Sequence, residues 1–403
     1  MSTVKLDRQI AGLPKEVKFC RKCVVSNQRP RILFDDEGVC SACRFAEYKH
    51  NQIDWDAREK MLEELLDLHR RDDGRYDVIV PVSGGKDGSR VAHELKYKWG
   101  MNPLTITWSP FEYTDIGFRN FRNFIGAGFD NLLATPNGEL HRKLSRLSFM
   151  SLGDAWDPFA YGQMAYSFHI ALKFDIKLVF YGENGEAEYG GDPKNNDKPG
   201  MPFEDWRDLY FKGAGVDNLL KLGRDQGIIT EREAREASMF YTPPSQQEMA
   251  KSGCSFHWFS YYQKWIPQEN YYYCKEHTGF EANPDGRSEG TYSKYASLDD
   301  QTDGFHFYLA YIKFGIARAT SDAAHEVRDG HITREEASAL VKRYDGEFPK
   351  KYFSEFLNYL GITEDDFNAV VDSWRSPLLW EKAGNDWRLK HAVYYPENAV
   401  EPL

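Results

Sequence analysis

The sequence predicts an α/β fold built on a parallel sheet, with a cysteine-rich module before the sheet and a mainly helical region after it. Between residues 76 and 184, short β-branched runs alternate with helix-compatible stretches, which is typical of βαβ units. Four of the six cysteines fall between residues 20 and 43. From about residue 291 the pattern favours helices. Together these observations define the three predicted parts of the chain.

The composition sets limits on location and partners. The chain has 403 residues, 41% of them hydrophobic and 15% aromatic, enough for an ordinary buried core. The formal charge of -11 at pH 7 argues against extended contacts with nucleic acid phosphates. No run of roughly 18 apolar residues occurs, and the first residues lack the apolar stretch of a signal peptide. We therefore expect a cytoplasmic protein with no membrane span and no nucleic acid partner.

The first predicted element is the cysteine module. Cys20 and Cys23 form one C-x2-C pair, Cys40 and Cys43 form a second, and sixteen residues separate the pairs. This spacing lets two tight knuckles converge on one tetrahedral ion, and four thiolates suit a closed, structural Zn²⁺ site. Two disulfides or an iron–sulfur cluster are the alternatives. A short hairpin is expected between the pairs, with its turn at residues 36–38.

A helix within residues 53–71 precedes four expected strands. The strands are the run from Tyr76 to Val82, Pro103–Ser109, Asn131–Thr135 and Ile176–Asn184. Ligands of parallel sheets bind at the carboxyl ends of the strands. The loops SGGKDGS and GENGEAEYGG follow the first and fourth of these strands. The sequence therefore predicts one crevice bordered by both loops.

The loop SGGKDGS, residues 83–89, predicts an anion site. Gly84 and Gly85 allow backbone N–H groups to approach a phosphate, and the helix that follows adds the positive end of its dipole. The Walker A and G-x-G-x-x-G patterns both fail here. The segment resembles the SGGxDS pyrophosphate loop of the PP-loop ATPases, which bind ATP and cleave it between the α and β phosphates.

One position departs from that loop. Gly88 stands where the family has its second serine, and Ser89 follows one place later. Either the loop is one residue longer, or Gly88 supplies only a backbone amide while the helix starts late. The departure leaves the match at Ser83, Gly84, Gly85 and Asp87 intact.

Nearly the whole chain resembles the N-acetyl sugar amidotransferases of bacterial surface-polysaccharide and nonulosonate pathways. Five blocks carry the resemblance in this order: CRKCVVSNQRPRILFDDEGVCSAC, SGGKDGS, FYGENGEAEYGG, WIPQENYYY and KFGIARATSDAAHEVRDGHITREEA. It implies a HUP-like core of the adenine nucleotide alpha hydrolase type. The domains are then expected as a four-cysteine zinc ribbon (1–50), a PP-loop ATP-binding core (51–195), an insertion with remaining core elements (196–290) and a helical C-terminal region (291–403).

The resemblance also implies a reaction, the ATP-dependent conversion of an acetamido group into an acetamidino group on a nucleotide-linked N-acetyl sugar. AMP transfer to the amide oxygen, departure of pyrophosphate and attack by ammonia would achieve it. The catalytic candidates are Lys86, Asp87 and Glu183, with Asp87 as a Mg²⁺ ligand. The candidates for contact with ATP are Ser83, Gly84, Gly85, Lys86, Asp87, Gly88, Ser89, Trp108, Asn184 and Arg318.

Several candidates have a structural alternative. Asp87 could serve only the helix dipole, and Trp108 could be a core residue. Glu183, Asn184 and their acidic neighbours could be solvated loop residues. Arg318, on one helix face with Asp322 and His325, could form a surface ion pair.

Two longer segments have open interpretations. The aromatic run SFHWFSYYQKWIPQENYYY is either a packed core strand and turn or a platform for a sugar or uridine. Residues 193–253 have no clear strand pattern and are expected to be an insertion that covers the crevice.

The nitrogen source is expected to lie outside this chain. Ser2 follows Met1 and no G-x-C-x-G elbow occurs, so no glutaminase nucleophile is visible. The resemblance implies partner subunits similar to the glutaminase and the cyclase of imidazole glycerol phosphate synthase. A tRNA-thiolating PP-loop enzyme is the alternative, but it would need reactive cysteines near the loop, and Cys254 and Cys274 are interpreted as buried thiols. A non-catalytic zinc-ribbon scaffold is a further alternative.

Overall fold

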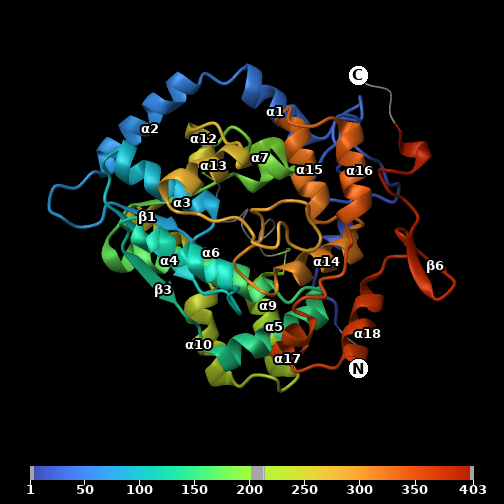
Figure 1. Cartoon of the computed structure of the whole chain (residues 1–403). Coiled ribbons are helices and arrows are strands. Elements are labelled where there is room, and N and C mark those ends of the chain that lie inside the picture. Colours follow the sequence, from blue (N-terminus) through green and yellow to red (C-terminus); the bar gives the residue numbers. More distant parts are fainter. Residues whose placement is uncertain (1–3, 201–211, 213, 400–403) are drawn as a thin grey trace.

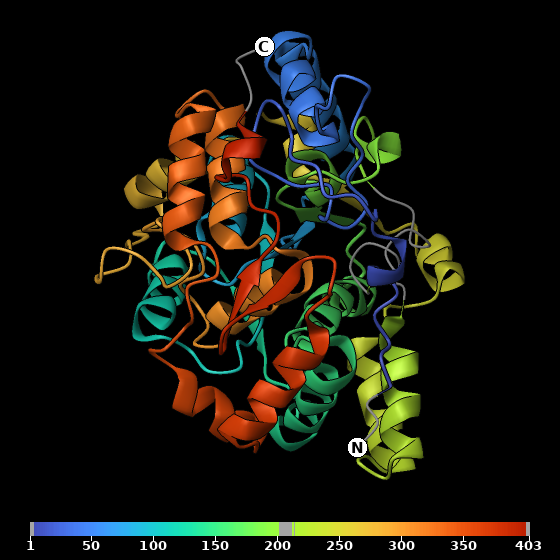
Figure 2. The ribbon, with the colours of Figure 1, turned by 90° about the vertical axis from the view of Figure 1, so that its right-hand side faces the viewer.

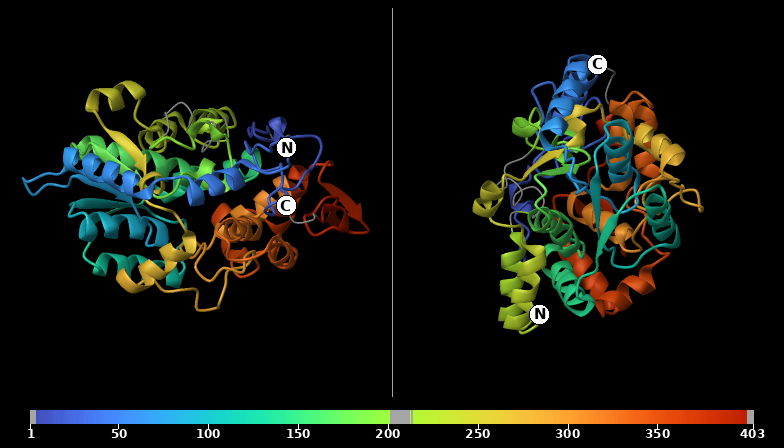
Figure 3. Two further views of the ribbon diagram at one scale, coloured as in Figure 1. Left: turned by 90° about the horizontal axis from the view of Figure 1, so that it is seen from above. Right: turned by 90° about the vertical axis from the view of Figure 1, so that its left-hand side faces the viewer.

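The computed structural model describes residues 4–200, 212 and 214–399 (Figure 1). Figure 1 shows the sheet on one side of the molecule and the helices α14–α16 on the other. Figure 3, seen from above, shows the same division, with the dark blue N-terminal segment beside the orange C-terminal helices. The two sides meet at the carboxyl ends of the strands, where the site described below lies.

A five-stranded sheet forms the core, in the order β3-β2-β1-β4-β5. Its neighbouring strands are all parallel. Ile79 joins the apolar cluster on one face, whereas Val78 and Val80 join the cluster on the other, as alternating side chains must. The strands are β1 (Val78–Pro81), β2 (Pro103–Trp108), β3 (Asn131–Ala134), β4 (Leu178–Tyr181) and β5 (Ser255–Trp258). The predicted parallel α/β fold is confirmed, and the strand order reverses at β1.

Helices cover both faces of the sheet and fill the connections between its strands. The expected helix before the first strand is present as α2. The helices before α14 are α1 (Ser41–Asn51), α2 (Trp55–His69), α3 (Lys86–His93), α4 (Asp115–Gly126), α5 (Gly138–Leu152), α6 (Asp157–Phe174), α7 (Gly185–Tyr189), α9 (Gly215–Asp225), α10 (Glu231–Tyr241), α11 (Gln246–Ser252), α12 (Phe259–Tyr262) and α13 (Pro267–His277).

The described part of residues 193–253 is mostly helical. Helix α9 packs on α5 and α10 packs on α6, and buried side chains such as Leu219 and Tyr241 belong to the largest apolar cluster. Figure 2 shows these yellow-green helices away from the orange C-terminal helices. Helices α9–α11 contribute no described residue to the cavity at the strand ends. The expectation that this segment covers the crevice finds no support there; residues 201–211 and 213 lie outside the described residues.

The aromatic run contains β5, α12 and the start of α13. Its rings at Trp258, Phe259 and Trp265 are almost fully buried. This agrees with the core alternative for the run. The sheet thus gains a fifth strand that the sequence pattern presented only as an aromatic stretch.

The C-terminal region is helical as predicted, with an added hairpin that Figure 2 shows on the outside of the molecule. Thr333 and Glu336 form a capping box, since Thr333 Oγ1 accepts a bond from Glu336 N at 3.2 Å and Glu336 Oε2 accepts one from Thr333 N at 2.8 Å. In the described ranges, no helix has the length and apolar character needed to cross a membrane. The elements are α14 (Asp303–Phe314), α15 (Arg318–Arg328), α16 (Arg334–Tyr344), α17 (Phe353–Leu360), α18 (Glu364–Trp374), β6 (Trp380–Ala383) and β7 (Asp386–Leu389).

Candidate active site

The SGGKDGS loop forms the turn from β1 into α3. Gly84 has a φ of 95°, in the left-handed region, and a Cβ there would lie 2.5 Å from the backbone N and Cα of Phe121 in α4. No side chain fits at that separation. Gly85 is the N-cap residue of α3, and the helix begins at Lys86. The free N–H groups of the first helical turn therefore lie directly after the two glycines.

The packing of α3 against β1 explains why residue 88 is a glycine. A Cβ at this position would lie 2.5 Å from the carbonyl oxygen of Pro81 and 3.2 Å from the Cα of Val82. The first turn of α3 is thus pressed against the end of β1, and a serine would not fit. The expectation of a late helix start is wrong, because α3 begins before Asp87. Ser89 has no exposed surface, its Oγ has no hydrogen-bond partner among the described residues, and it does not line the cavity.

A cavity of about 480 Å³ opens where β1, β2 and β4 end. One side is the phosphate-loop wall, which we define as residues 83–88. The other side is the C-terminal wall, defined as residues 295–318, which includes the start of α14 and of α15. Between them lie Trp108 after β2, Gln163 in α6 and Glu183 after β4. The predicted crevice at the strand ends is therefore present.

The charges on the phosphate-loop wall are held in place by neighbours. Lys86 is buried and its ammonium group pairs with the carboxylate of Asp87. Asp87 also accepts a hydrogen bond from Asn270 Nδ2 at 3.0 Å. Asn270 lies on α13, inside the WIPQENYYY block, and its side chain also accepts a bond from Arg90. Sequence reasoning missed Asn270; a fully buried amide in an aromatic run gave no signal of its own.

Glu183 follows β4 and faces the same cavity. Burial, followed by the negative charge of Asp87, raises the pKa of the Glu183 carboxyl to about 7. The hydroxyl of Tyr189 donates to Glu183 Oε1 at 3.4 Å. A carboxyl with this pKa can take or give a proton near neutral pH.

Asn184 lies outside the described cavity lining. Its Oδ1 caps α7 by accepting a bond from Glu186 N at 3.1 Å, and its Nδ2 donates to Asn195 O at 3.1 Å. Glu186 and Glu188 are buried, and pair with Arg31 at 2.7 Å and Lys49 at 2.9 Å. These neighbours are therefore not solvated loop acids, and their contacts stabilise α7. Among them, Glu183 alone lines the cavity within the described residues.

Three carboxylates on the C-terminal wall were missed in the sequence: Asp299, Asp300 and Asp303. Burial raises the pKa of Asp300 to about 7, although its carboxylate accepts bonds from Phe111 N at 2.6 Å and Thr302 N at 2.8 Å. Burial also raises the pKa of Asp299 and of Asp303. The D-D-x-x-D spacing before α14 was the available signal.

Trp108 and Arg318 both line the cavity. Trp108 is 5% exposed and packs closely against Gly162, so it is also a core residue. Arg318 is the first residue of α15, and its Nε lies 3.0 Å from Asp322 Oδ1. This ion pair faces the cavity rather than open surface, which places a guanidinium opposite the phosphate-loop wall.

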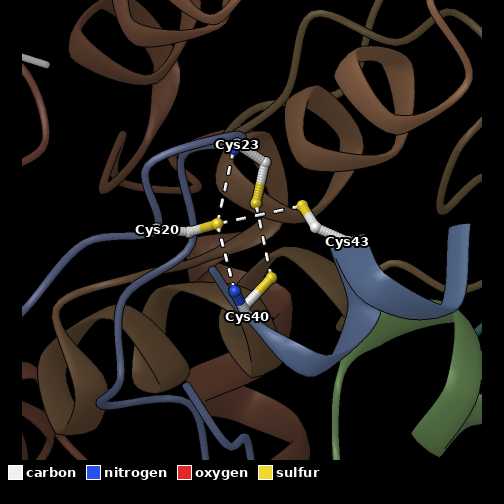
Figure 4. Close-up of side chains that lie close together, drawn as sticks. All are labelled: Cys20, Cys23, Cys40 and Cys43. Carbon is white, nitrogen blue, oxygen red and sulfur yellow. Dashed lines mark hydrogen bonds between the residues drawn. The ribbon is translucent and has the colours of Figure 1, made fainter. Parts of the chain in front are cut away.

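The four predicted metal ligands come together in a separate, buried cluster (Figure 4). The Sγ atoms of Cys20 and Cys43 lie 3.8 Å apart, as do those of Cys23 and Cys40. A tetrahedral ion with metal–sulfur bonds of about 2.3 Å places sulfurs about 3.8 Å apart, whereas a disulfide needs about 2.05 Å. The four thiols can therefore hold one tetrahedral metal ion, and the disulfide alternative is not supported.

The cysteine cluster packs against the C-terminal helices. Its apolar neighbours include Ala323 and Ala324 of α15 and Val341 of α16. Arg334 Nε also donates to the carbonyl oxygens of Cys20 and Cys23 at 3.2 and 3.1 Å. Together with the Arg31–Glu186 pair, these contacts connect the cluster to α7 and α15 at the cavity.

The two remaining cysteines differ in position. Cys274 is fully buried, and its thiol donates to the carbonyl oxygen of Lys86 at 3.0 Å. It thus lies beneath the loop, although it is far from the loop in the sequence. Burial raises the pKa of the Cys274 thiol to about 12 and that of the partly buried Cys254 to about 11. Both thiols are protonated at neutral pH.

Comparisons with known proteins give local and distant similarities. An uncharacterised protein of Methanocaldococcus jannaschii is 29% identical over 89 residues, which are 22% of this chain and 31% of that protein. This chain therefore spans about a third of the length of that relative. The NH3-dependent NAD synthetase from Campylobacter jejuni, in complex with nitrate, has a TM-score of 0.28 and 11% identity, covering 50% of this chain and 98% of that one. The NMN synthetase from Francisella tularensis has a TM-score of 0.27 and 14% identity, covering 50% and 92%.

A family model matches the C-terminal wall and the helices behind it. The match spans residues 289–394, and the model is described as "LPS biosynthesis protein WbpG-like, C-terminal domain". It includes Asp299, Asp303 and Arg318, which line the cavity. The C-terminal region of this chain is thus similar to the WbpG-like C-terminal domain of lipopolysaccharide biosynthesis proteins, as the resemblance in the sequence blocks predicts.

Proposed function

We propose that this protein is an ATP-dependent amidotransferase that converts the acetamido group of a nucleotide-linked N-acetyl sugar into an acetamidino group. The observation that carries the proposal is the phosphate-loop wall, where side chains are excluded at Gly84 and Gly88 and the helix N-terminus borders a cavity beside Asp87. The match of residues 289–394 to a lipopolysaccharide biosynthesis domain supports a role in surface-polysaccharide biosynthesis. We further propose nonulosonate biosynthesis as the alternative pathway and the cytoplasm as the location.

The phosphate-loop wall suits the phosphates of ATP. Ser83, Gly84 and Gly85 offer a hydroxyl and backbone amides, and the α3 N-terminus adds its dipole. The carboxylate of Asp87, oriented by Asn270, would hold Mg²⁺, which when bound neutralises charge on the departing pyrophosphate. Lys86 supplies a further positive charge, and Trp108 offers an apolar surface for adenine. We assign no direct contact with ATP to Ser89 or Asn184, which lie outside the described lining.

The chemistry follows from activation of an unreactive amide. The amide oxygen attacks the α-phosphorus, forming a C–O–P linkage, and the bond to the bridging oxygen breaks, with its electron pair leaving on pyrophosphate. Ammonia then adds to the imidate carbon, and AMP leaves with the electrons of the C–O bond. Glu183, with a pKa of about 7, takes the proton from an incoming ammonium ion, because only neutral ammonia attacks.

The ammonia comes from a separate glutaminase subunit, similar to that of imidazole glycerol phosphate synthase and acting with a cyclase-like subunit. The cysteines of this chain support that division. Four form the metal cluster, and the thiols of Cys254 and Cys274 have raised pKa values. The same raised pKa values argue against a tRNA-thiolating reaction, which needs a thiolate, although Cys274 lies close to the loop.

We assign Zn²⁺ to the cysteine cluster as a structural ion. All four tetrahedral positions are taken by thiols, so no position is open for a substrate. The cluster lies against α15 and supports α7 through the Arg31–Glu186 pair. Zinc would therefore stabilise α7 and the C-terminal wall at α15 without taking part in the reaction.

The test is incubation of the purified chain with ATP, Mg²⁺, ammonium and a panel of UDP- and CMP-linked N-acetyl sugars. Mass spectrometry should detect replacement of the amide oxygen by an imino group, with AMP and pyrophosphate released in step. Glutamine should not replace ammonium until the glutaminase partner is added. Stoichiometric ADP and phosphate, or sulfur transfer to tRNA, would contradict the proposal.

A further inference from the structure

The C-terminal wall contains a histidine–aspartate pair that has no role in the scheme above. His306 lies on α14, and its Nδ1 is 2.7 Å from Asp154 Oδ2. Its ring stacks on Trp156, with centroids 4.7 Å apart and an interplanar angle of 30°. His306 and Trp156 both line the 480 Å³ cavity. The imidazole is therefore fixed by the contact of Nδ1 with Asp154 and by stacking on Trp156, and it borders the cavity.

The environment of Asp154 determines which nitrogen of His306 carries the proton. Asp154 is 6% exposed, and Lys212 Nζ lies 3.0 Å from the same carboxylate oxygen. Burial alone would raise the pKa of Asp154, but the positive charges of His306 and Lys212 hold it below its usual value. An anionic acceptor keeps the proton on Nδ1. No described residue forms a hydrogen bond with Nε2, so its lone pair is available.

The charged groups around the pair carry a net negative charge. Two lysines, the partly buried Lys212 and the buried Lys313, face three buried aspartates around the pair. Lys212 bonds to Asp154 and Asp157, and Lys313 bonds to Asp7. With every one of these groups ionised, the set has a net charge of -1. On the cavity side, Asp303 lies one helical turn before His306 on α14. These groups can therefore balance the positive charge that the ring gains when it takes a proton.

Helix α14 borders two adjoining cavities. A second cavity of about 460 Å³ adjoins the first, and Asp303, Phe307 and Arg318 line both. Each cavity has the size of one ligand site. If the phosphate-loop wall holds ATP, a nucleotide-linked sugar reaches the phosphates past α14, where His306 lies.

We propose that His306 is the catalytic base of the activation step and that Asp154 is its positioning residue; this rests on the proposed function. As the amide oxygen attacks the α-phosphorus, Nε2 takes the proton of the amide N–H. The electrons of that N–H bond form the C=N bond of the imidate, and pyrophosphate leaves with the electrons of the broken P–O bond. In the next step Glu183 takes the proton from the ammonium ion. His306 and Glu183 therefore accept protons in different steps of the reaction.

The first test needs no substrate. In the full-length protein labelled with ¹⁵N-histidine, two-bond ¹⁵N–¹H spectra distinguish the tautomers, and His306→Asn identifies the signal. The neutral ring should carry its proton on Nδ1, and Asp154→Asn should weaken that preference, because the acceptor at Nδ1 is then no longer an anion. A proton on Nε2 in the wild-type protein would overturn the proposal.

The second test isolates the activation step. Sugar-dependent exchange of labelled pyrophosphate into ATP, without ammonium, should fall about 10²–10⁴-fold in His306→Asn, while ATP affinity stays unchanged. The asparagine amide can still donate to Asp154, which protects the fold. Asp154→Asn should lower the exchange rate in parallel with the loss of the Nδ1 preference, which a merely structural role of Asp154 would not change.

A matched control is His331→Asn. His331 Nδ1 lies 2.8 Å from Glu326 Oε2, and its side chain is 29% exposed, close to the 26% of His306. It lines neither cavity, so exchange should be unchanged. If the wild type exchanges and His306→Asn remains within about tenfold of it, the role of His306 is wrong. If the wild type exchanges with no sugar of the panel, the proposed function itself fails, and the role of His306 fails with it.

Discussion

The two walls of the cavity are built in different ways. The phosphate-loop wall consists of six consecutive residues whose backbone is determined locally, by two glycines that cannot accept a Cβ and by the start of α3. The C-terminal wall gathers Asp299, His306 and Arg318 from a loop and two helices. Some of its charged groups have partners far away in the sequence, as the His306–Asp154 pair and the bond from Phe111 to Asp300 show. A nucleotide can be recognised by a short motif, whereas the acceptor site depends on the tertiary structure.

The largest effect is expected at Asp87. Asp87→Ala should reduce turnover by several orders of magnitude with every sugar, because the variant loses the charge that we propose to hold Mg²⁺. Steady-state release of AMP measures it. Asp87→Asn keeps an oxygen for Asn270 but removes the charge, so it should be as inactive as the alanine variant. An active asparagine variant, or a loss below about tenfold, would mean that Asp87 only stabilises the helix.

Gly84→Ala should have the next largest effect. The added Cβ would lie 2.5 Å from the backbone of Phe121 and must displace the loop, and a displacement of about 1 Å costs about 10²-fold in rate. Both ATP affinity and turnover should fall. Gly74→Ala is the control, since Gly74 also has a positive φ, 77°, but has nothing within 4 Å. Equal losses of ATP affinity and turnover in both variants would contradict a specific role of the phosphate-loop wall in ATP binding.

Arg318→Met should distinguish the role of the C-terminal wall in sugar binding from the role of the phosphate-loop wall in ATP binding. Loss of a charged hydrogen-bond partner costs roughly 10- to 100-fold, and we expect it in the KM for the sugar rather than in the KM for ATP. Initial-rate measurements with each substrate varied in turn test this. Arg232→Met is a control, because Arg232 also forms an i,i+4 pair, with Glu236, away from both cavities. A loss confined to ATP would assign Arg318 to the nucleotide instead.

Cys43→Ser should affect stability more than catalysis. Metal analysis should find about one Zn²⁺ per wild-type chain and much less in the variant, with a lower Tm. Activity per folded molecule should fall by less than about tenfold, because the ion has no open position. Cys274→Ser changes another buried cysteine outside the cluster and should keep the metal. A visible iron–sulfur absorption after anaerobic purification would contradict the assignment of zinc.

The smallest effect is expected when Cys254 and Cys274 are both replaced by serine. Both thiols have raised pKa values and neither lines the cavity. The ammonium-driven reaction, followed by mass spectrometry, should stay within about threefold of the wild type for a variant that keeps its fold. A folded but inactive variant would reveal cysteine chemistry in the nitrogen step and revive the thiolation alternative.

The parts of the molecule that depend on local pattern could be predicted from the sequence. Four strands, the loop SGGKDGS and the C-x2-C pairs each depend on residues close together in the chain, and all are present where expected. The fifth strand, β5, could not be distinguished from a buried aromatic turn, because so short an apolar run has no clear period.

Much of the C-terminal wall, and Asn270 behind the phosphate-loop wall, was missed for a physical reason. Asn270, Asp303 and His306 gain their positions through contacts that span more than a hundred residues, with Asp87, Trp156 and Asp154 respectively. Asn184 shows the opposite error. It follows a strand end, where ligands bind, yet its amide serves as a helix cap, and the same residue type suits both roles.

The position of the cysteine cluster has a consequence for how the chain reaches its native state. The apolar surface around Cys20 and Cys43 is covered by Ala323, Val341 and Val393. During synthesis the cysteine segment therefore leaves the ribosome some 300 residues before its covering helices exist. Until these helices are made, the four thiols are exposed to solvent, and the apolar surface around them can aggregate. Early capture of the metal ion would protect the nascent segment in that interval. Late docking of α15 and α16 would then complete the catalytic cavity as almost the last event of folding.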